Sequence, residues 1–562
     1  MSQVSPNPLR FSKIITATET ILLLVAAVFL TLHALHLNAD FPNHSPWMDW
    51  AKYTDEGWYG DAAIRHFQRG QWNVPGDFNP AAALPIWPLL EAALFRFTGV
   101  SLVAARALTV AIFGLILSSS YLLLRRWHNL TVPTEKNSAA SLAPAIAVIL
   151  LAVSPFCYVF TRMAILEPLL ILFTLLALLA SSYAEPPPQQ GTDTAPWKDR
   201  LRRALPLLAL GLLLPLMILT KTTAVFLLPA IAWLLWARAG YSLRPFLRLS
   251  LPPVIVAAAL WLGYYGLLVR PHFLLDYRYL FNANGYTGIT LATAFSVLGD
   301  TLNDGLWIGK LLYPLALLAA ASTLLLRPRL LRNPLIPALL LWAGGYAAFL
   351  AYHNNLQPRY YLVIAVPLTL LVPVVFETLW IRTGTAAIGP IRRMAVATVA
   401  AALAVVAVTD ARQTLHYVHT PDYTFTTAAA QIHRIIAADH THNHLVLSIS
   451  GSNLSLMTGL PSICDDFGTM DLAVRVKAYR PGWYVAWNHV EDDKMDALTP
   501  MYHLQRVAAF PAMDDPERNL LILYRLDPAS PATPPRHRRK PVLPHLLQTS
   551  FGQQPSITQL QH

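Results

Sequence analysis

Long uncharged apolar runs recur along the first 410 residues of the chain. Each run holds about 17–25 residues, which is enough to cross a hydrocarbon core about 30 Å thick. The runs do not alternate between apolar and polar residues as barrel strands do, and backbone groups in lipid must pair within a helix. We therefore predict eleven membrane-spanning helices, near residues 14–36, 100–124, 141–160, 163–183, 204–220, 222–238, 249–269, 306–326, 334–352, 360–381 and 394–410.

The pattern changes after about Asp410, where apolar runs shorten to the length of strands, as in Leu445–Ile449 and Leu520–Tyr524. Thr427–Ala438 keeps a helical period. We predict a polytopic α-helical membrane protein with a small C-terminal extracytoplasmic α/β domain. Its parts are a transmembrane domain at 1–410 that includes an outer loop at 37–99, the mixed α/β domain at 411–527, and a disordered, basic and Pro-rich tail at 528–562.

Basic residues gather in every second connection between the predicted spans, beginning with the N-terminus. Cytoplasmic loops carry an excess of Lys and Arg. The N-terminus is therefore expected in the cytoplasm, and an odd number of spans places the C-terminal domain outside. We predict a multi-pass integral protein of the inner or plasma membrane.

The composition agrees with this class, because only 13% of the residues are Asp, Glu, Lys or Arg, against about 25% in ordinary globular domains. A net charge of +11 would indicate a nucleic-acid partner in a soluble chain. Here the basic residues lie in short groups between apolar runs, so no nucleic acid is expected. The two cysteines indicate neither a disulfide framework nor a cysteine metal site.

Polar residues at the outer ends of the spans are the candidates for catalysis or binding, because a charged side chain near hydrocarbon is energetically costly and is usually kept for a function. The first cluster holds Asp55 and Glu56 among aromatic residues, just after the first span. These carboxylates could accept a proton from a hydroxyl while the aromatic rings hold a sugar. They could equally begin a helix, with Thr54 as its cap and Asp61 paired with Arg65. Both interpretations stay open.

Two further clusters each hold few charges. Arg162 and Glu167 are the only charges of the hairpin between the third and fourth spans, and they form either part of a site or an interfacial pair. Lys221 joins the fifth and sixth spans beside hydroxyl groups and near a helix N-terminus. It is either a phosphate contact or an interfacial anchor.

The last two clusters combine Arg and His with aromatic residues. One follows the seventh span and contains Arg270, His272 and Asp276, and the other contains His353 and the stretch from Arg359 to Tyr361. Each could be a headgroup anchor, but five clusters at one face favour a common pocket. His272 and His353 could bind a divalent metal with an acid, although no HxxxH or CxxC spacing supports a metal site.

Several catalytic motifs are absent from the sequence. No Walker A, GxGxxG or kinase motif lies on the predicted cytoplasmic side, so the energy must arrive in the substrate. No GxSxG nucleophile elbow is present either.

The order of these features resembles the membrane glycosyltransferases of the GT-C fold, over about residues 10–380. The similar families are the bacterial relatives of protein O-mannosyltransferases and of the aminoarabinose transferase that modifies lipid A. The residues that carry the resemblance are Asp55-Glu56, Pro85, Pro88, Phe97-Thr98-Gly99, Arg106, Arg162, Glu167-Pro168, Thr220-Lys221 and Gln357-Pro358-Arg359-Tyr360-Tyr361.

The resemblance implies an enzyme that moves one hexosyl or pentosyl unit, with inversion, from a polyprenyl-phosphate sugar to an extracytoplasmic lipid, glycan or protein. It implies Asp55 as the general base, with Glu56 beside it in the acceptor or donor site. Glu167 would match the acid of the second outer loop, with Arg162 beside it. The lipid phosphate would contact Lys221 and Arg359, with Arg270 and Tyr360 as further candidates. The family's occasional metal dependence is not carried over, so no cofactor is assigned, and a divalent metal near the acids stays open.

The chain departs from these families after residue 410, where its sequence matches none of their outer domains, so the acceptor stays open. The alternative function is a transporter or flippase for lipid-linked sugars. Transporters place polar residues and broken helices near the midplane, often in repeated halves, whereas the polar residues here lie at the outer ends. A third hypothesis is a sensor whose outer domain binds a ligand, but it assigns no function to the acids of the first loop.

Overall fold

The computed structural model describes residues 8–131, 141–186, 197–283, 290–326, 328–353, 356–382, 390–516 and 518–529. The predicted tail at 528–562 lies outside the described residues from position 530 onward.

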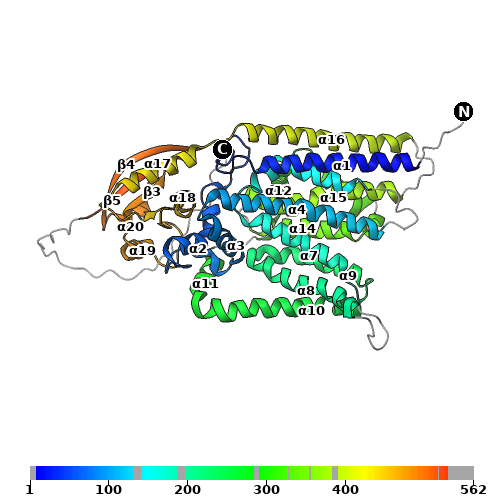
Figure 1. Ribbon diagram of the computed structural model, residues 1–562, viewed down its shortest axis with the longest axis horizontal. Coiled ribbons are helices and arrows are strands. Elements are labelled where there is room, and N and C mark those ends of the chain that lie inside the picture. The colour runs from blue at the N-terminus through cyan, green and yellow to red at the C-terminus, as the bar shows by residue number, and fades with distance from the viewer. Residues whose placement is uncertain are drawn as a thin grey trace, which may run out of the picture.

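Apolar helices form a bundle that occupies most of the molecule (Figure 1). Eight described segments are long and apolar enough to cross a membrane. They comprise α1 (Pro8–His33), α4 (Leu102–Thr131), α7 (Leu166–Tyr183), α8 (Trp197–Thr220), α10 (Leu243–Tyr264) with η5 (Tyr265–Phe273) and α11 (Leu274–Ala283), α14 (Leu335–His353), η9 (Pro358–Tyr361) with α15 (Leu362–Arg382), and α16 (Pro390–His419). The helical membrane class is confirmed.

Three shorter apolar segments lie at the remaining predicted positions. Eight of the eleven predicted spans are therefore long enough, as described, to cross a membrane. They are α5 (Ala143–Val153), η4 (Thr222–Leu227) with α9 (Leu228–Arg238), and α13 (Leu312–Ala321) with η7 (Ser322–Leu326). The third predicted span is broken because Pro155 begins a separate helix, α6 (Pro155–Phe160), and the Ser154 side chain accepts a hydrogen bond from Cys157 N at its start.

Short helices of the outer loop cover one end of this bundle, which we call the loop end (Figure 1). They are η1 (Trp50–Lys52), α2 (Asp55–Arg69), η2 (Pro80–Ala82) and α3 (Ile86–Thr98). Helix α2 ends at Gly70, whose φ of 69° is favourable for glycine. The other short helices are α12 (Leu291–Asp304), η6 (Gly305–Ile308) and η8 (Pro328–Arg332).

A small mixed α/β domain follows α16, and its presence confirms the predicted C-terminal domain. Its five-stranded sheet has the order β2-β1-β3-β5-β4, with β1 parallel to β2 and β3 and with β5 antiparallel to β3 and β4. The elements are α17 (Thr424–Ala438), β1 (Val446–Leu447), α18 (Gly451–Thr458), β2 (Ser462–Ile463), α19 (Leu472–Tyr479), β3 (Trp483–Trp487), α20 (Asp492–Leu498), β4 (Tyr502–Asp515) and β5 (Arg518–Pro528).

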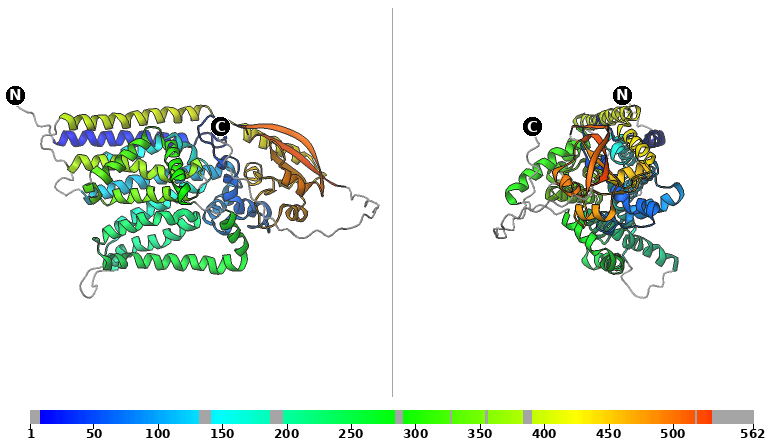
Figure 2. Two further views of the ribbon diagram at one scale, coloured as in Figure 1. Left: turned by 180° about the vertical axis from the view of Figure 1, so that it is seen from behind. Right: turned by 90° about the vertical axis from the view of Figure 1, so that its left-hand side faces the viewer.

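The sheet domain lies against the loop end, with α2 and α3 between it and the bundle (Figure 1), and the left view of Figure 2 shows the same order from behind. Buried polar contacts hold it there. Asp77 of the outer loop accepts hydrogen bonds from Arg65 of α2 and from Arg475 of α19, at 2.5 and 2.9 Å. Asp40 likewise accepts from the backbone N–H of Phe425 at the start of α17.

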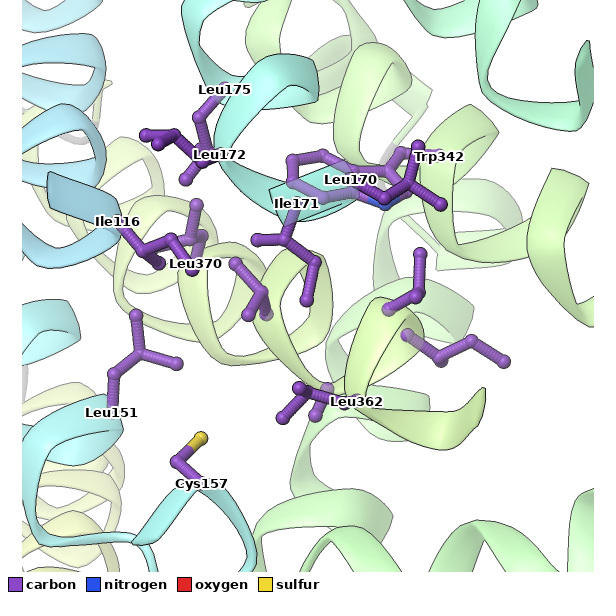
Figure 3. Close-up of a cluster of buried hydrophobic side chains, with 14 of the residues drawn as sticks. Ile116, Leu151, Cys157, Leu170, Ile171, Leu172, Leu175, Trp342, Leu362 and Leu370 are labelled. Carbon is purple, nitrogen blue, oxygen red and sulfur yellow. The ribbon is translucent and has the colours of Figure 1, made fainter. Parts of the chain in front are cut away.

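The main apolar core lies inside the bundle and fixes the helices that carry polar residues at the loop end. Figure 3 shows its centre, where Ile116, Leu151, Leu170, Trp342 and Leu370 meet from α4, α5, α7, α14 and α15. All of these side chains are at most 1% exposed.

Candidate functional site

Asp55 begins α2 and is buried at the loop end, with only 2% of its surface exposed. Thr54 occupies the N-cap position, but its hydroxyl donates to Asp55 Oδ1 at 2.9 Å instead of capping the helix. The first turn of α2 therefore presents a carboxylate whose second oxygen, Oδ2, faces other partners.

Arg359 supplies that partner from the other end of the sequence. Its Nη2 atom lies 2.8 Å from Asp55 Oδ2. Asp49, just before η1, accepts hydrogen bonds from both the backbone nitrogen of Arg359, at 2.8 Å, and its Nη1 atom. Arg359 is held between two carboxylates and is 5% exposed.

A second ion pair lies beside the first. Lys221, in the short link between α8 and η4, donates to Glu167 Oε1 in the first turn of α7. Glu167 is fully buried, and its Oε2 atom has no hydrogen-bond partner among the described residues. Pro168 after it fits the first turn of the helix.

Tyr360 joins the two pairs into one cluster. The Lys221 Nζ atom lies 4.2 Å from the centre of its ring, and the Arg359 guanidinium carbon lies 4.7 Å from it. Arg359 Nη2 also donates to the Tyr360 hydroxyl at 3.2 Å. We call Asp49, Asp55, Glu167, Lys221, Arg359 and Tyr360 the loop-end cluster.

Tyr59 lies one turn after Asp55 on α2 and adds a phenol to this cluster. Burial raises its pKa well above the ordinary value, and the charge of Asp55 acts in the same direction. The hydroxyl therefore stays protonated, as a hydrogen-bond donor, throughout the physiological range.

The cluster can still bind an anion, although its three carboxylates outnumber its two cations. An ammonium group has three donors, and the Lys221 contacts given above use one of them. The Arg359 Nε atom has no hydrogen-bond partner among the described residues. Donors on both cations are therefore available to a phosphate or another anionic ligand.

The structure brings together five of the residues expected in the site from the resemblance, which are Asp55, Glu167, Lys221, Arg359 and Tyr360, and places others elsewhere. Glu56 forms an ion pair with Arg106 of α4, at 2.6 Å, and accepts a hydrogen bond from the backbone of Ala164. Arg162 donates to the backbone oxygens of Leu35 and His36 rather than to Glu167. Both residues brace the outer loop against the bundle.

Asp61 and Arg270 also lie apart from the cluster. Asp61 is paired with Arg65 at 2.8 Å, as one of the two interpretations expected, and accepts from Ser452 of α18. Burial raises the pKa of Asp61 to about 6, and Arg65 opposes that shift. Arg270 is exposed on η5, and no hydrogen bond or ion pair links it to the loop-end cluster within the described part of the chain.

Sequence reasoning missed Asp49 and counted Tyr59 only among the aromatic residues of the first cluster. Asp49 had a signal, because it is a further acid among aromatic residues in the same outer loop, six positions before Asp55. Tyr59 could have been found from helical spacing, since residues four apart lie on one face of a helix. Among the described residues, no three His, Cys, Asp or Glu side chains form a group that could hold a metal ion.

Comparison with known proteins rests on structure alone, because no family model and no curated protein matches the chain. The structure is similar to ArnT from Cupriavidus metallidurans bound to undecaprenyl phosphate, over 90% of this chain and 98% of ArnT, at 16% identity and a TM-score of 0.56. The apo state of ArnT gives the same coverage and TM-score at 15% identity. The chain has the GT-C fold.

A third solved structure is more distant. The archaeal oligosaccharyltransferase AglB from Archaeoglobus fulgidus, in complex with an inhibitory peptide and a dolichol-phosphate, is similar over 84% of this chain and 69% of its own, at 14% identity and a TM-score of 0.46. The likeness to ArnT confirms the GT-C fold that the sequence resemblance implied.

Proposed function

We propose that this protein is a glycosyltransferase that moves one hexosyl or pentosyl unit from a polyprenyl-phosphate-linked donor to an extracytoplasmic lipid, glycan or protein. The observation that supports this function is the loop-end cluster, in which Asp55 contacts Arg359 beside the pair of Lys221 and Glu167. The buried carboxylate of Asp55 can take the proton of the acceptor's hydroxyl group. The two cations, with their free donors, can stabilise the phosphate that leaves.

The proposed reaction is a single displacement with inversion. The acceptor hydroxyl gives its proton to the carboxylate of Asp55, and its oxygen attacks the anomeric carbon from the face opposite the phosphate. The bond between that carbon and the phosphate oxygen breaks, and its electron pair leaves with the polyprenyl phosphate. A phosphate is already stable as an anion, so no general acid is required.

Lys221 and Arg359 would bind the donor phosphate and stabilise the charge that gathers on it as the bond breaks. The support is the unpaired Nε donor of Arg359, the ammonium donors of Lys221 beyond its bond to Glu167, and the similarity to ArnT, whose structure is described as bound to undecaprenyl phosphate. Tyr360 would hold both cations in place through its ring. Apolar helices around the site suit a prenyl chain.

The remaining candidates are proposed as positioning residues. Glu167 would orient Lys221, and Glu56 would fix α2 through Arg106. Arg162 and the pair of Asp61 with Arg65 would hold the outer loop. Arg270 is proposed only as a contact for the polar part of the donor as it arrives, because it is exposed on η5.

Mass spectrometry of envelope glycolipids and glycoproteins tests the function in cells that have the gene, lack it, or carry the Asp55→Asn variant. We expect one class of molecule to lose one sugar without the gene, and Asp55→Asn to fail to restore it. The control is Asp492→Asn, which changes an exposed acid in the first turn of α20 and should restore the sugar fully. An unchanged envelope in the deleted strain would refute the function.

Transfer by the purified protein in detergent separates the enzyme from a transporter, because detergent leaves no membrane to cross. We expect transfer from the lipid-linked donor by the wild type and none by Asp55→Asn, while that variant still binds the donor. Full transfer by Asp55→Asn would remove Asp55 as the base.

A further inference from the structure

Helix α18 of the C-terminal domain packs closely against the first turn of α2. A Cβ atom built on Gly57 would lie 2.2 Å from the backbone nitrogen of Asn453 and 2.5 Å from the backbone oxygen of Ser452. Only glycine permits this approach. The contact lies two residues after Asp55, so the C-terminal domain reaches the helical turn that carries the proposed base.

Asn453 caps α2 from this position. Its Oδ1 atom accepts a hydrogen bond from Gly57 N at 2.5 Å. Gly57 is the third residue of α2, whose N–H group is normally bound by the N-cap side chain. The Thr54 hydroxyl is engaged with Asp55 and with the backbone of Trp50 instead. A side chain 396 positions away therefore replaces the local cap.

The cap also fixes the direction of the Asn453 amide. Because Gly57 N is a donor, the oxygen of the amide must face it, and the amide cannot be reversed without losing the bond. The nitrogen and oxygen of a carboxamide are about 2.3 Å apart, so Nδ2 lies within about 5 Å of Gly57 N.

The Nδ2 group has no hydrogen-bond partner among the described residues, although Asn453 is only 1% exposed. A buried donor without a partner lowers stability, and most buried polar groups in proteins are paired. Such a donor, held rigidly beside the first turn of α2, is suited to an oxygen atom of a ligand.

We propose that Asn453 Nδ2 donates a hydrogen bond to an oxygen of the sugar acceptor, next to the hydroxyl that Asp55 deprotonates. This inference rests on the proposed function. The acceptor is favoured over the donor because Lys221 and Arg359, the proposed phosphate ligands, come from the helical bundle, whereas Asn453 comes from the sheet domain. The C-terminal domain thereby supplies a residue that determines acceptor specificity, in addition to supporting the membrane domain.

Two substitutions separate this role from capping. Asn453→Asp keeps an oxygen for Gly57 N–H but removes the Nδ2 donor, whereas Asn453→Ala removes both. The matched control is Gln68→Ala, which deletes another side-chain hydrogen bond between α2 and α18, from Gln68 Nε2 to Ser455 O at 3.4 Å, at the end of α2 far from Asp55.

The assay uses the full-length protein in detergent with the lipid-linked donor, and its acceptor is an envelope lipid and glycan extract from cells that lack the gene. We expect both Asn453 variants to need at least tenfold more extract for half-maximal transfer, with half-saturation by the donor unchanged within twofold. Asn453→Asp buries a new carboxylate, so we expect it to unfold at a lower temperature than wild type, and Gln68→Ala should keep the wild-type values in all measurements.

Wild-type half-saturation by the extract in Asn453→Asp would overturn the inference and leave Asn453 as a cap alone. That result leaves the proposed function intact, because the wild type still transfers sugar. Absence of transfer by the wild type would instead refute the proposed function itself.

Discussion

Arg359 places its Nη2 atom 2.8 Å from Oδ2 of Asp55, so the proposed phosphate ligand and the proposed base are in direct contact. A phosphate that draws the guanidinium towards itself would weaken its contact with Asp55. Binding of the donor and release of the base for catalysis are therefore linked through one side chain. Asp49 limits this movement, because it binds both the backbone and the side chain of Arg359.

We expect Asp49→Asn to lower kcat about tenfold while donor affinity stays within threefold of wild type. The amide keeps one acceptor oxygen but loses the charge that clamps Arg359, and a hydrogen bond to a charged group contributes about 1.5–3 kcal/mol. Steady-state transfer and donor binding by the purified protein check this. A variant with unchanged kcat would show that Asp49 does not position Arg359 for the reaction.

A double substitution separates the structural and binding roles of Lys221. Lys221→Met alone leaves Glu167 as a buried, unpaired carboxylate, and breaking a buried ion pair in this way costs about 3–5 kcal/mol. Lys221→Met combined with Glu167→Gln removes both charges, so we expect the midpoint of thermal unfolding to recover.

Donor affinity should not recover in the double variant, because the ammonium donors are gone. We expect it to bind the polyprenyl-phosphate sugar at least tenfold more weakly than wild type, whereas Glu167→Gln alone, which keeps the ammonium, should lose less affinity. Wild-type affinity in the double variant would exclude Lys221 as a phosphate ligand.

The length of apolar runs predicted the membrane helices, and the polar residues at their ends predicted most of the loop-end cluster. The prediction that placed Asp55 and Glu56 in one site did not consider the directions in which neighbouring side chains leave a helix. Consecutive residues of an α-helix are turned by about 100° from each other, so two adjacent carboxylates leave the helix in different directions and can meet different partners. In the structure Asp55 meets Arg359 and Glu56 meets Arg106.

The other missing parts depend on contacts between distant segments. Asp49 and Arg359 are 310 positions apart, and Gly57 and Asn453 are 396 apart. No local pattern marks Asn453 as a cap for α2, because Thr54 stands at the usual position. The break between α5 and α6, in contrast, could have been predicted from Ser154-Pro155 alone.

Gly57→Ala should separate α18 from α2, because the added methyl group has no space against the backbone of Ser452 and Asn453. We expect the midpoint of thermal unfolding to fall and transfer to drop at least a hundredfold. The control is Gly344→Ala in α14, where a Cβ would meet no atom within 4 Å. That change should preserve activity and raise stability by about 0.4–1 kcal/mol. Full activity of Gly57→Ala would show that the close approach of α18 is dispensable.

The last prediction concerns Asp465 in the C-terminal domain. Burial raises its pKa from the ordinary 3.8 to about 7, and the charge of Lys494 only partly opposes this. Its Oδ1 atom has no hydrogen-bond partner among the described residues, while Oδ2 accepts from the Tyr484 hydroxyl at 3.0 Å. The folded protein therefore binds a proton at this carboxyl that the unfolded chain has already released.

Between about pH 4 and pH 7 the folded state holds more protons than the unfolded state at this position, so stability falls as pH rises. Each unit of pKa shift corresponds to about 1.4 kcal/mol, which makes this loss a few kcal/mol. Asp465→Asn keeps an oxygen for Tyr484 and never ionises. We expect it to unfold at a higher temperature than wild type at pH 8, and at nearly the same temperature at pH 4.

Thermal unfolding of the full-length protein in detergent, measured at pH 4, 6 and 8, checks this prediction. The control is Asp496→Asn, which changes an exposed acid of α20, and it should keep the wild-type dependence on pH. Parallel curves for wild type and Asp465→Asn across this range would show that the buried carboxyl ionises in the folded protein as it does in the unfolded chain. The burial of Asp465 would then have no effect on its titration, and any change of the unfolding temperature with pH would come from other groups.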